Sequence, residues 1–154
     1  MVRPKKQRMI KHPPPFRKFK PAGIPGKVVE SIILSIDEYE AIRLADYEGF
    51  SHAESAEKMC VSRSTFSRLI EIARKKFAKL IVEGKSLDIE GGDIHFYRDS
   101  ITCQNCGHIF NDEISGKKTS CPQCGSSDII RHAEQLGHGQ CCHRFNRQTG
   151  SYKS

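Results

Sequence analysis

The 154-residue sequence predicts two small domains, a mainly α N-terminal domain and a small β domain built around cysteine pairs. Three observations predict this division. Serine-capped segments with helical periodicity fill the first half, a Gly91-Gly92 pair follows them, and two Cys-x-x-Cys pairs lie beyond it. We expect domains over residues 28–92 and 93–133, a flexible basic arm over residues 1–27 and a flexible tail over residues 134–154.

The N-terminal arm is basic and rich in proline. Residues 1–30 carry nine Lys or Arg and one acid, a net charge of +8, whereas the whole chain has +7. Six of the seven prolines lie before residue 26, and proline excludes a core helix because it lacks a backbone N–H and clashes with the preceding turn. We expect an extended arm with Phe16 and Phe19 as anchors, followed by residues 28–34, which fit either a helix or a strand.

Three helices are predicted next, each starting after a serine. The starts are Ser35 and Ser51, each in a capping box with the glutamate three residues later, and Ser62. The first helix should end at Gly49 and bury Tyr39, Ile42, Leu44 and Ala45. The third should end at Gly84 and bury a stripe at helical spacing, made of Phe66, Leu69, Ile70, Ala73, Phe77 and Leu80.

The second and third helices are separated by a tight turn, which is typical of a helix-turn-helix motif. Small Ala56 permits their close approach, and Val61 should be buried after the turn. With the apolar stripe facing the core, a polar set points outward at the start of the third helix: Arg63, Ser64, Ser67 and Arg68. Arginine can bind guanine through two hydrogen bonds, so this set is predicted to contact base edges of duplex DNA. Phosphate contacts are predicted for Lys75 and for the arm residues Arg3, Lys5, Lys6 and Arg8.

Residues 34–85 resemble the DNA-binding region 4 of bacterial sigma factors. Over residues 1–92, the chain more closely resembles an uncharacterised, predicted DNA-binding prokaryotic family, domain of unknown function 134. The motifs are RPKK (3–6), FKPAGIP (19–25), RLADYEG (43–49), VSRSTFSRL (61–69) and VEGK (82–85). The resemblance implies a helix-turn-helix DNA-binding role without a known target. Cys60 stands where the turn usually has glycine, and Ser55 replaces a usually aliphatic residue, so Cys60 must adopt a left-handed backbone. We expect Cys60 to be a buried, inert thiol rather than a redox sensor.

The second half carries two matching cysteine pairs, each followed by glycine. Cys103, Cys106, Cys121 and Cys124 have the spacing of a four-thiolate site, predicted to be a zinc ribbon with one structural Zn²⁺. Iron is the minor alternative, because tetrahedral thiolate sites accept both metals. A second site at Cys141, Cys142 and His143, with His132 and His138 nearby, is a weaker hypothesis, since adjacent cysteines chelate one ion poorly and the segment is expected to be unpacked.

The resulting interpretation is a cytoplasmic protein that resembles a transcription regulator and is not an enzyme. No apolar stretch approaches a membrane span, and no catalytic constellation stands out. The expected partner is duplex DNA, with RNA polymerase or another transcription protein as a further partner, and a homodimer is compatible with the sequence. Two alternatives remain open: a protein-docking adaptor of the transcription machinery, and an RNA- or ribosome-associated zinc-ribbon protein. The absence of tryptophan counts against RNA, because RNA readers stack bases on exposed aromatic rings.

Overall fold

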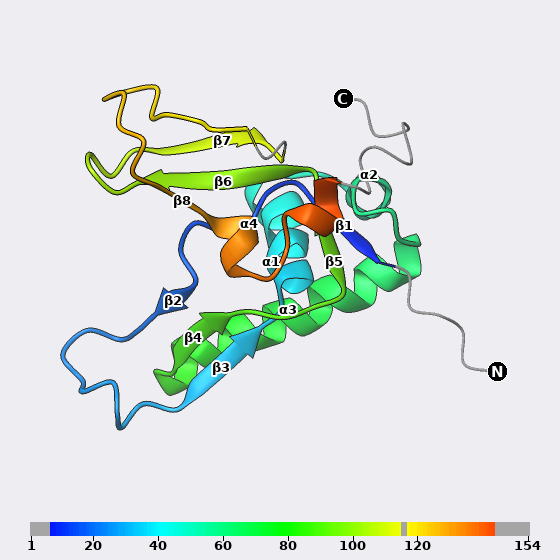
Figure 1. Cartoon of the computed structure of the whole chain (residues 1–154). Coiled ribbons are helices and arrows are strands. Elements are labelled where there is room, and N and C mark those ends of the chain that lie inside the picture. The colour runs from blue at the N-terminus through cyan, green and yellow to red at the C-terminus, as the bar shows by residue number, and fades with distance from the viewer. Residues whose placement is uncertain (1–6, 115–116, 144–154) are drawn as a thin grey trace. The chain divides into compact units, whose positions relative to one another are not determined.

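The computed structural model describes residues 7–114 and 117–143 and divides the chain into two compact units (Figure 1). The N-terminal unit contains the described residues up to Ile10 and Phe16–Ile94, and the C-terminal unit contains Lys11–Pro15 and the described residues from His95 onward. Helices occur together with three small sheets, so the chain is not mainly α, and the expected mainly α N-terminal domain also contains short strands.

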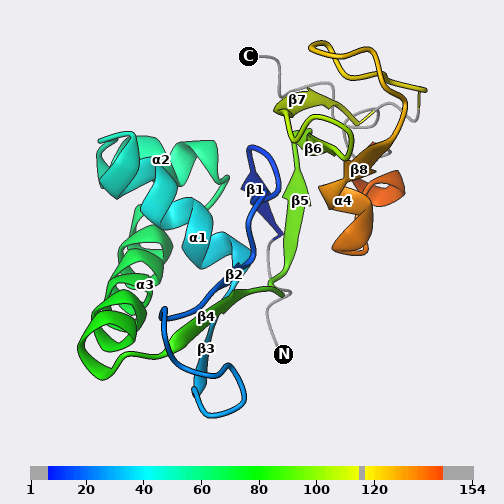
Figure 2. The same cartoon turned by 90° about the vertical axis from the view of Figure 1, so that its left-hand side faces the viewer.

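The helices of the N-terminal unit lie together, and a small sheet lies at the C-terminal end of the longest helix (Figure 2). The elements are β1 (Arg8–Ile10), β2 (Lys18–Phe19), β3 (Ser31–Leu34), α1 (Ile36–Ile42), the π-helix η1 (Arg43–Tyr47), α2 (His52–Lys58), α3 (Arg63–Glu83) and β4 (Ser86–Ile89).

Side-chain caps fix where these helices begin, and the three predicted starts are confirmed. Ser35 and Ser51 each form a capping box with the glutamate three residues later, and the Ser62 hydroxyl accepts a hydrogen bond from the Thr65 N–H at 3.1 Å. Each cap satisfies backbone N–H groups that have no partner within the helix. Helix α3 ends at Gly84, whose left-handed backbone (φ 63°) closes the last turn, as predicted.

The buried face of α1 differs from the predicted one. Tyr39 and Ile42 are only half-buried, whereas Asp37 and Glu40 are buried. These carboxylates can be buried because they are paired: Asp37 with Arg8, and Glu40 with the Arg43 guanidinium at 2.8 Å. The apolar part of the core is completed by residues from several elements: Leu34, Ile36, Leu44, Phe66 and Ile70.

Strands of the N-terminal unit form where an arm and an ambiguous segment were expected. Residues 28–34, which fitted either a helix or a strand, are extended only in β3, which pairs in parallel with β4. Strand β2 pairs antiparallel with the other edge of β4, so β4 is the central strand. In β1, Met9 and Ile10 are fully buried, so the description of residues 1–27 as a flexible arm is wrong for this part. Phe16 and Phe19 are 61% and 49% exposed and do not anchor the segment.

The C-terminal unit is built on a three-stranded antiparallel sheet. The sheet consists of β6 (Arg98–Cys103), β7 (Ile109–Glu113) and β8 (Ile129–Arg131), with β6 as the central strand, and α4 (His132–Gln135) follows it. The boundary between the two units falls within the short strand β5 (Ile94–Phe96). The expected unpacked tail is wrong for residues 134–143, because a helical turn there buries Cys142 completely.

Candidate functional site

A four-residue turn, Met59–Ser62, joins α2 to α3. The turn is tied to β1, because the Met9 N–H donates to the Met59 carbonyl at 3.1 Å and the Met59 side chain is fully buried. Cys60 has φ 55° and is the one non-glycine residue with positive φ among those described, as its position in the turn predicts. It is half-buried rather than buried. The turn is held by the Met59 carbonyl and by the buried Met59 side chain, and this fixes the direction of α3 after the turn.

A second set of contacts joins α2 directly to α3. The His52 ring packs edge-on against Phe66 with 5.4 Å between ring centroids, and its Nδ1 lies 3.0 Å from the Ser67 hydroxyl. Ala56 is 3% exposed, which confirms the predicted close approach, while Val61 is only half-buried. Ser67 therefore helps to hold the two helices together.

The start of α3 presents the other predicted base-contacting residues to solvent. Arg63, Ser64 and Arg68 are exposed, and the Ser64 hydroxyl lies 3.1 Å from that of Ser62. Lys75 is also exposed and forms an ion pair with Glu71 one helical turn earlier, at 3.2 Å. The structure thus brings two guanidinium groups to one exposed helix end.

The predicted phosphate contacts of the arm separate into two groups. Arg3, Lys5 and Lys6 lie outside the described residues. Arg8 lies in β1, where its guanidinium is paired with the buried carboxylate of Asp37. Arg8 therefore has a structural partner within its own unit, and its charge is already balanced.

The four predicted cysteine ligands converge in the C-terminal unit. All four sulfurs lie within 4.8 Å of one another, with Sγ–Sγ distances of 3.6 Å between Cys103 and Cys124 and between Cys106 and Cys121. Four sulfurs held about 2.3 Å from one ion would lie about 3.8 Å apart in a tetrahedron. All seven cysteines of the chain are described, and none is in a disulfide. The cluster could therefore hold a metal ion.

The two cysteine pairs have the same backbone geometry. In each pair the glycine after the second cysteine donates its N–H to the carbonyl of the first cysteine at 2.9 Å, and both glycines, Gly107 and Gly125, have left-handed φ angles. The Ser126 N–H and the Asn105 side-chain amide hold the pKa of Cys124 down at about 6. Such donors stabilise the thiolate form that a metal requires.

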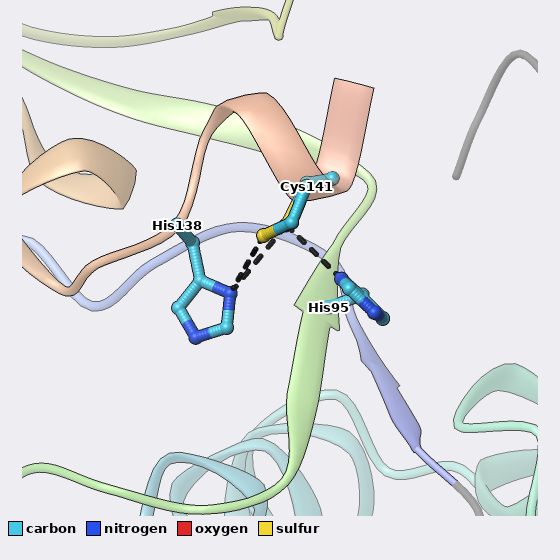
Figure 3. Close-up of side chains that lie close together, drawn as sticks. His95, His138 and Cys141 are labelled. Carbon is cyan, nitrogen blue, oxygen red and sulfur yellow. Dashed lines mark hydrogen bonds between the residues drawn. The ribbon is translucent and has the colours of Figure 1, made fainter. Parts of the chain in front are cut away.

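A second group of donors lies in the same unit and was only partly predicted. His95, His138, Cys141 and Cys142 bring their donor atoms within 4.8 Å of one another. Figure 3 shows three of these side chains, His95, His138 and Cys141, close together. His132 and His143 are not in this group, although the sequence suggested both. His95 was missed, because it lies on β5 and no local spacing links it to the cysteines. Burial raises the pKa of the Cys142 thiol to about 11 and, together with the nearby His95, lowers the pKa of His138.

In the described ranges, no helix combines the length and the apolarity that crossing a membrane requires.

These features define a small two-unit protein, with an exposed cationic helix start in one unit and cysteine clusters that could hold metal ions in the other. The chain belongs to the family described as protein of unknown function DUF134, whose family model matches residues 1–97. A relative from Chloroherpeton thalassium, called a UPF0251 protein, is 49% identical over 129 residues, which cover 84% of this chain and 85% of the relative. Another UPF0251 protein, from Moorella thermoacetica, is 40% identical over 147 residues and 96% of each chain. No solved structure matches the chain.

Proposed function

We propose that the protein binds duplex DNA sequence-specifically, as a transcription regulator, with α2, the turn and α3 acting as a helix-turn-helix. The observation that supports this most directly is the exposed start of α3, where Arg63 and Arg68 lie just after a turn fixed by Met59 and Cys60. A helix presented in this way fits the major groove with its first residues at the base edges.

Within this proposal, the contacts of the described residues suggest different roles for members of the predicted set. Arg68 and Arg63 carry base recognition through bidentate hydrogen bonds to guanine. Ser64, at the exposed helix start, contacts a base or a phosphate. Ser67 acts as a positioning residue, because its hydroxyl lies against His52 of α2. Phosphate contacts come from Lys75 and from the three basic residues Arg3, Lys5 and Lys6, whereas Arg8 leaves the set because it is paired with Asp37.

The test begins with selection of bound sequences from a random duplex pool. On the selected site, Arg68→Ala should cost about 1–3 kcal/mol and relax the preference at one base pair. Lys79→Ala, an exposed position in the second half of α3, is the matched control and should leave the preference unchanged. Selection that yields no preferred sequence, or equal losses in the two variants, would contradict the assignment.

The basic arm is tested separately. Replacing Arg3, Lys5 and Lys6 by alanine is better than deleting residues 1–11, because Met9 and Ile10 belong to the core. Binding to every duplex should weaken, and the slope of log K against log salt should fall by about 0.9 for each phosphate that the variant no longer neutralises. Sequence preference should persist, since phosphate contacts carry no base information.

Protein docking is a second candidate, favoured by exposed apolar residues on the distal half of α3. Ile81 and Val82 are 76% and 83% exposed. Val82→Asp should abolish binding to RNA polymerase if this face docks there, and that binding should depend little on salt because apolar contacts are not screened. Loss of DNA affinity in the same variant would instead assign the face to DNA.

The four-cysteine cluster fits one structural Zn²⁺. Four thiolates fill a tetrahedral zinc site and leave no position for substrate. The small C-terminal unit would then gain much of its folding free energy from the ion. Purified protein should contain zinc, and Cys121→Ser should lose this ion and the fold of the C-terminal unit, as seen by elemental analysis and NMR. Visible absorption from iron, or oxidation of all four thiols in the native protein, would contradict zinc.

A further inference from the structure

The cluster of two histidines and two cysteines at the end of the described chain shares no residue with the four-cysteine cluster. His95 Nδ1 lies 3.4 Å from Cys142 Sγ, and His138 Nδ1 lies 3.4 Å from Cys141 Sγ and 3.7 Å from Cys142 Sγ. The two sulfurs are 3.8 Å apart. Two nitrogens and two sulfurs therefore converge on one small volume.

These separations match tetrahedral coordination of a single ion. With metal–sulfur bonds of about 2.3 Å and metal–nitrogen bonds of about 2.0–2.1 Å, a tetrahedron places sulfurs about 3.8 Å apart and nitrogen about 3.6 Å from sulfur. The observed sulfur–sulfur gap is far longer than a disulfide bond of about 2.05 Å. Hydrogen bonds alone explain the grouping poorly, because His138 Nδ1 faces both thiols and can accept from only one at good geometry.

We propose that His95, His138, Cys141 and Cys142 form a second, structural metal site, with a closed N₂S₂ donor set suited to Zn²⁺. Two imidazoles and two thiolates are one of the common ligand sets of structural zinc. All four positions of the tetrahedron are taken by protein atoms, so the ion would stabilise the fold and would not activate water.

The backbone explains how adjacent cysteines can serve one ion. Gly137 and Gly139 have φ angles of 75° and 119°, which only glycine adopts readily, and they flank His138. The helical turn that follows is closed by the hydrogen bond from the His143 N–H to the Gly139 carbonyl at 2.9 Å. This turn points the fully buried Cys142 inward while the exposed Cys141 approaches the same volume from the surface side.

The surroundings of the cluster resemble those of a ligated thiolate. The Phe96 N–H donates to Cys142 Sγ at 3.3 Å, the kind of backbone contact that stabilises sulfur ligands. The Phe96 ring is fully buried and packs edge-on against His138 with 5.3 Å between ring centroids. An apolar wall on one side and a backbone donor on the other would orient the ligands and limit access of water to the ion.

The proposed ion has a clear structural consequence. Three ligands lie within residues 138–142 and the fourth lies on β5, 43 positions before His138. Binding would therefore close a long loop and fix residues 138–142 against His95 of β5. Closing a long loop is the arrangement in which a cross-link stabilises a fold most.

The test uses the full chain reconstituted with zinc. Wild-type protein should hold two ions, one in each cluster, and His138→Gln should hold one. His143→Gln is the matched control, because His143 is near in sequence but outside the cluster, and it should still hold two. A wild type with one ion, or two ions in His138→Gln, would overturn the proposal.

A measurement on the wild type alone avoids dependence on how the variant folds. X-ray absorption at the zinc edge should give an average shell of about three sulfurs and one nitrogen per ion, the mean of an S₄ and an N₂S₂ site. In His138→Gln, the shell should shift toward sulfur alone. An all-sulfur shell in the wild type would overturn the second site while leaving the four-cysteine site intact, so failures of the two assignments are distinguishable.

Discussion

The two units of this protein differ in the kinds of side chain that they bury. The core of the N-terminal unit is mostly aliphatic and aromatic, with Leu34, Ile36, Phe66 and Ile70 at most 2% exposed. Among the buried residues of the C-terminal unit are three cysteines and two histidines: Cys103, Cys121, Cys142, His95 and His132. With the proposed ions bound, metal coordination would supply stability to a unit that is too small to bury a large apolar core.

The difference extends to how each unit positions its functional groups. In the N-terminal unit, packing of α1 and α2 on α3 orients the exposed arginines, so the proposed DNA-reading surface depends on apolar contacts. In the C-terminal unit, the proposed functional groups are the clustered cysteines and histidines themselves. Damage to one unit should therefore leave the function of the other largely unchanged.

The strongest expected effect on the first unit comes from Phe66→Ala. This side chain is fully buried, and its removal should cost about 3–5 kcal/mol through reduced burial and a cavity. Denaturant unfolding followed by circular dichroism at 222 nm measures the loss, and elemental analysis should show unchanged metal content. Ile72→Ala is the control, because the Ile72 side chain on the same helix is 48% exposed, and it should change stability by no more than about 0.5 kcal/mol.

A smaller effect, of opposite sign, is expected at the turn. Cys60→Gly should stabilise the N-terminal unit by about 0.5–1 kcal/mol. A left-handed backbone is strained in residues that carry a Cβ atom, and glycine removes this strain. The stabilisation is only partial, because glycine also increases the conformational entropy of the unfolded chain. Cys60→Ala keeps the strain and should show no gain. Equal stability of the glycine and alanine variants would mean that the turn is unstrained.

The smallest effect concerns the ion pair between Asp46 and Arg74, which links η1 to α3 at the surface. The Arg74 guanidinium lowers the pKa of Asp46 through a hydrogen bond. The pair therefore stabilises the fold fully at pH values above the ordinary aspartate pKa of about 3.9. This contribution is lost as the pH falls through the lowered pKa of Asp46. Asp46→Asn should cost about 0.2–1 kcal/mol at neutral pH and nothing in strong acid. The same difference should shrink in high salt, and a difference independent of pH would contradict the pair.

Local signals in the sequence were sufficient for some elements and insufficient for others. The starts at Ser35, Ser51 and Ser62 and the end at Gly84 are encoded by residues within one helical turn, so they could be predicted. The convergence of the four cysteines, Cys103, Cys106, Cys121 and Cys124, could be predicted because each pair carries its own spacing.

Features that depend on distant partners could not be predicted in this way. Arg8 and Asp37 are 29 positions apart, and each alone resembles a solvated charge, so neither the pairing of the arm nor the burial of Asp37 could be anticipated. His95 has the same difficulty, because only the fold brings it to Cys142. Long-range pairing, rather than local propensity, accounts for the errors at Arg8, Asp37 and His95.

Hydrogen exchange measured by mass spectrometry, with and without a strong zinc chelator, tests most directly the claim that the two units are stabilised differently. Chelation should remove protection from the amides of β6, β7, β8 and residues 138–142, while α1, α2 and α3 keep theirs. Binding of the selected DNA through α3 should then persist in the chelated protein. Unchanged protection in the C-terminal unit, or equal loss of protection in α1, α2 and α3, would contradict the account.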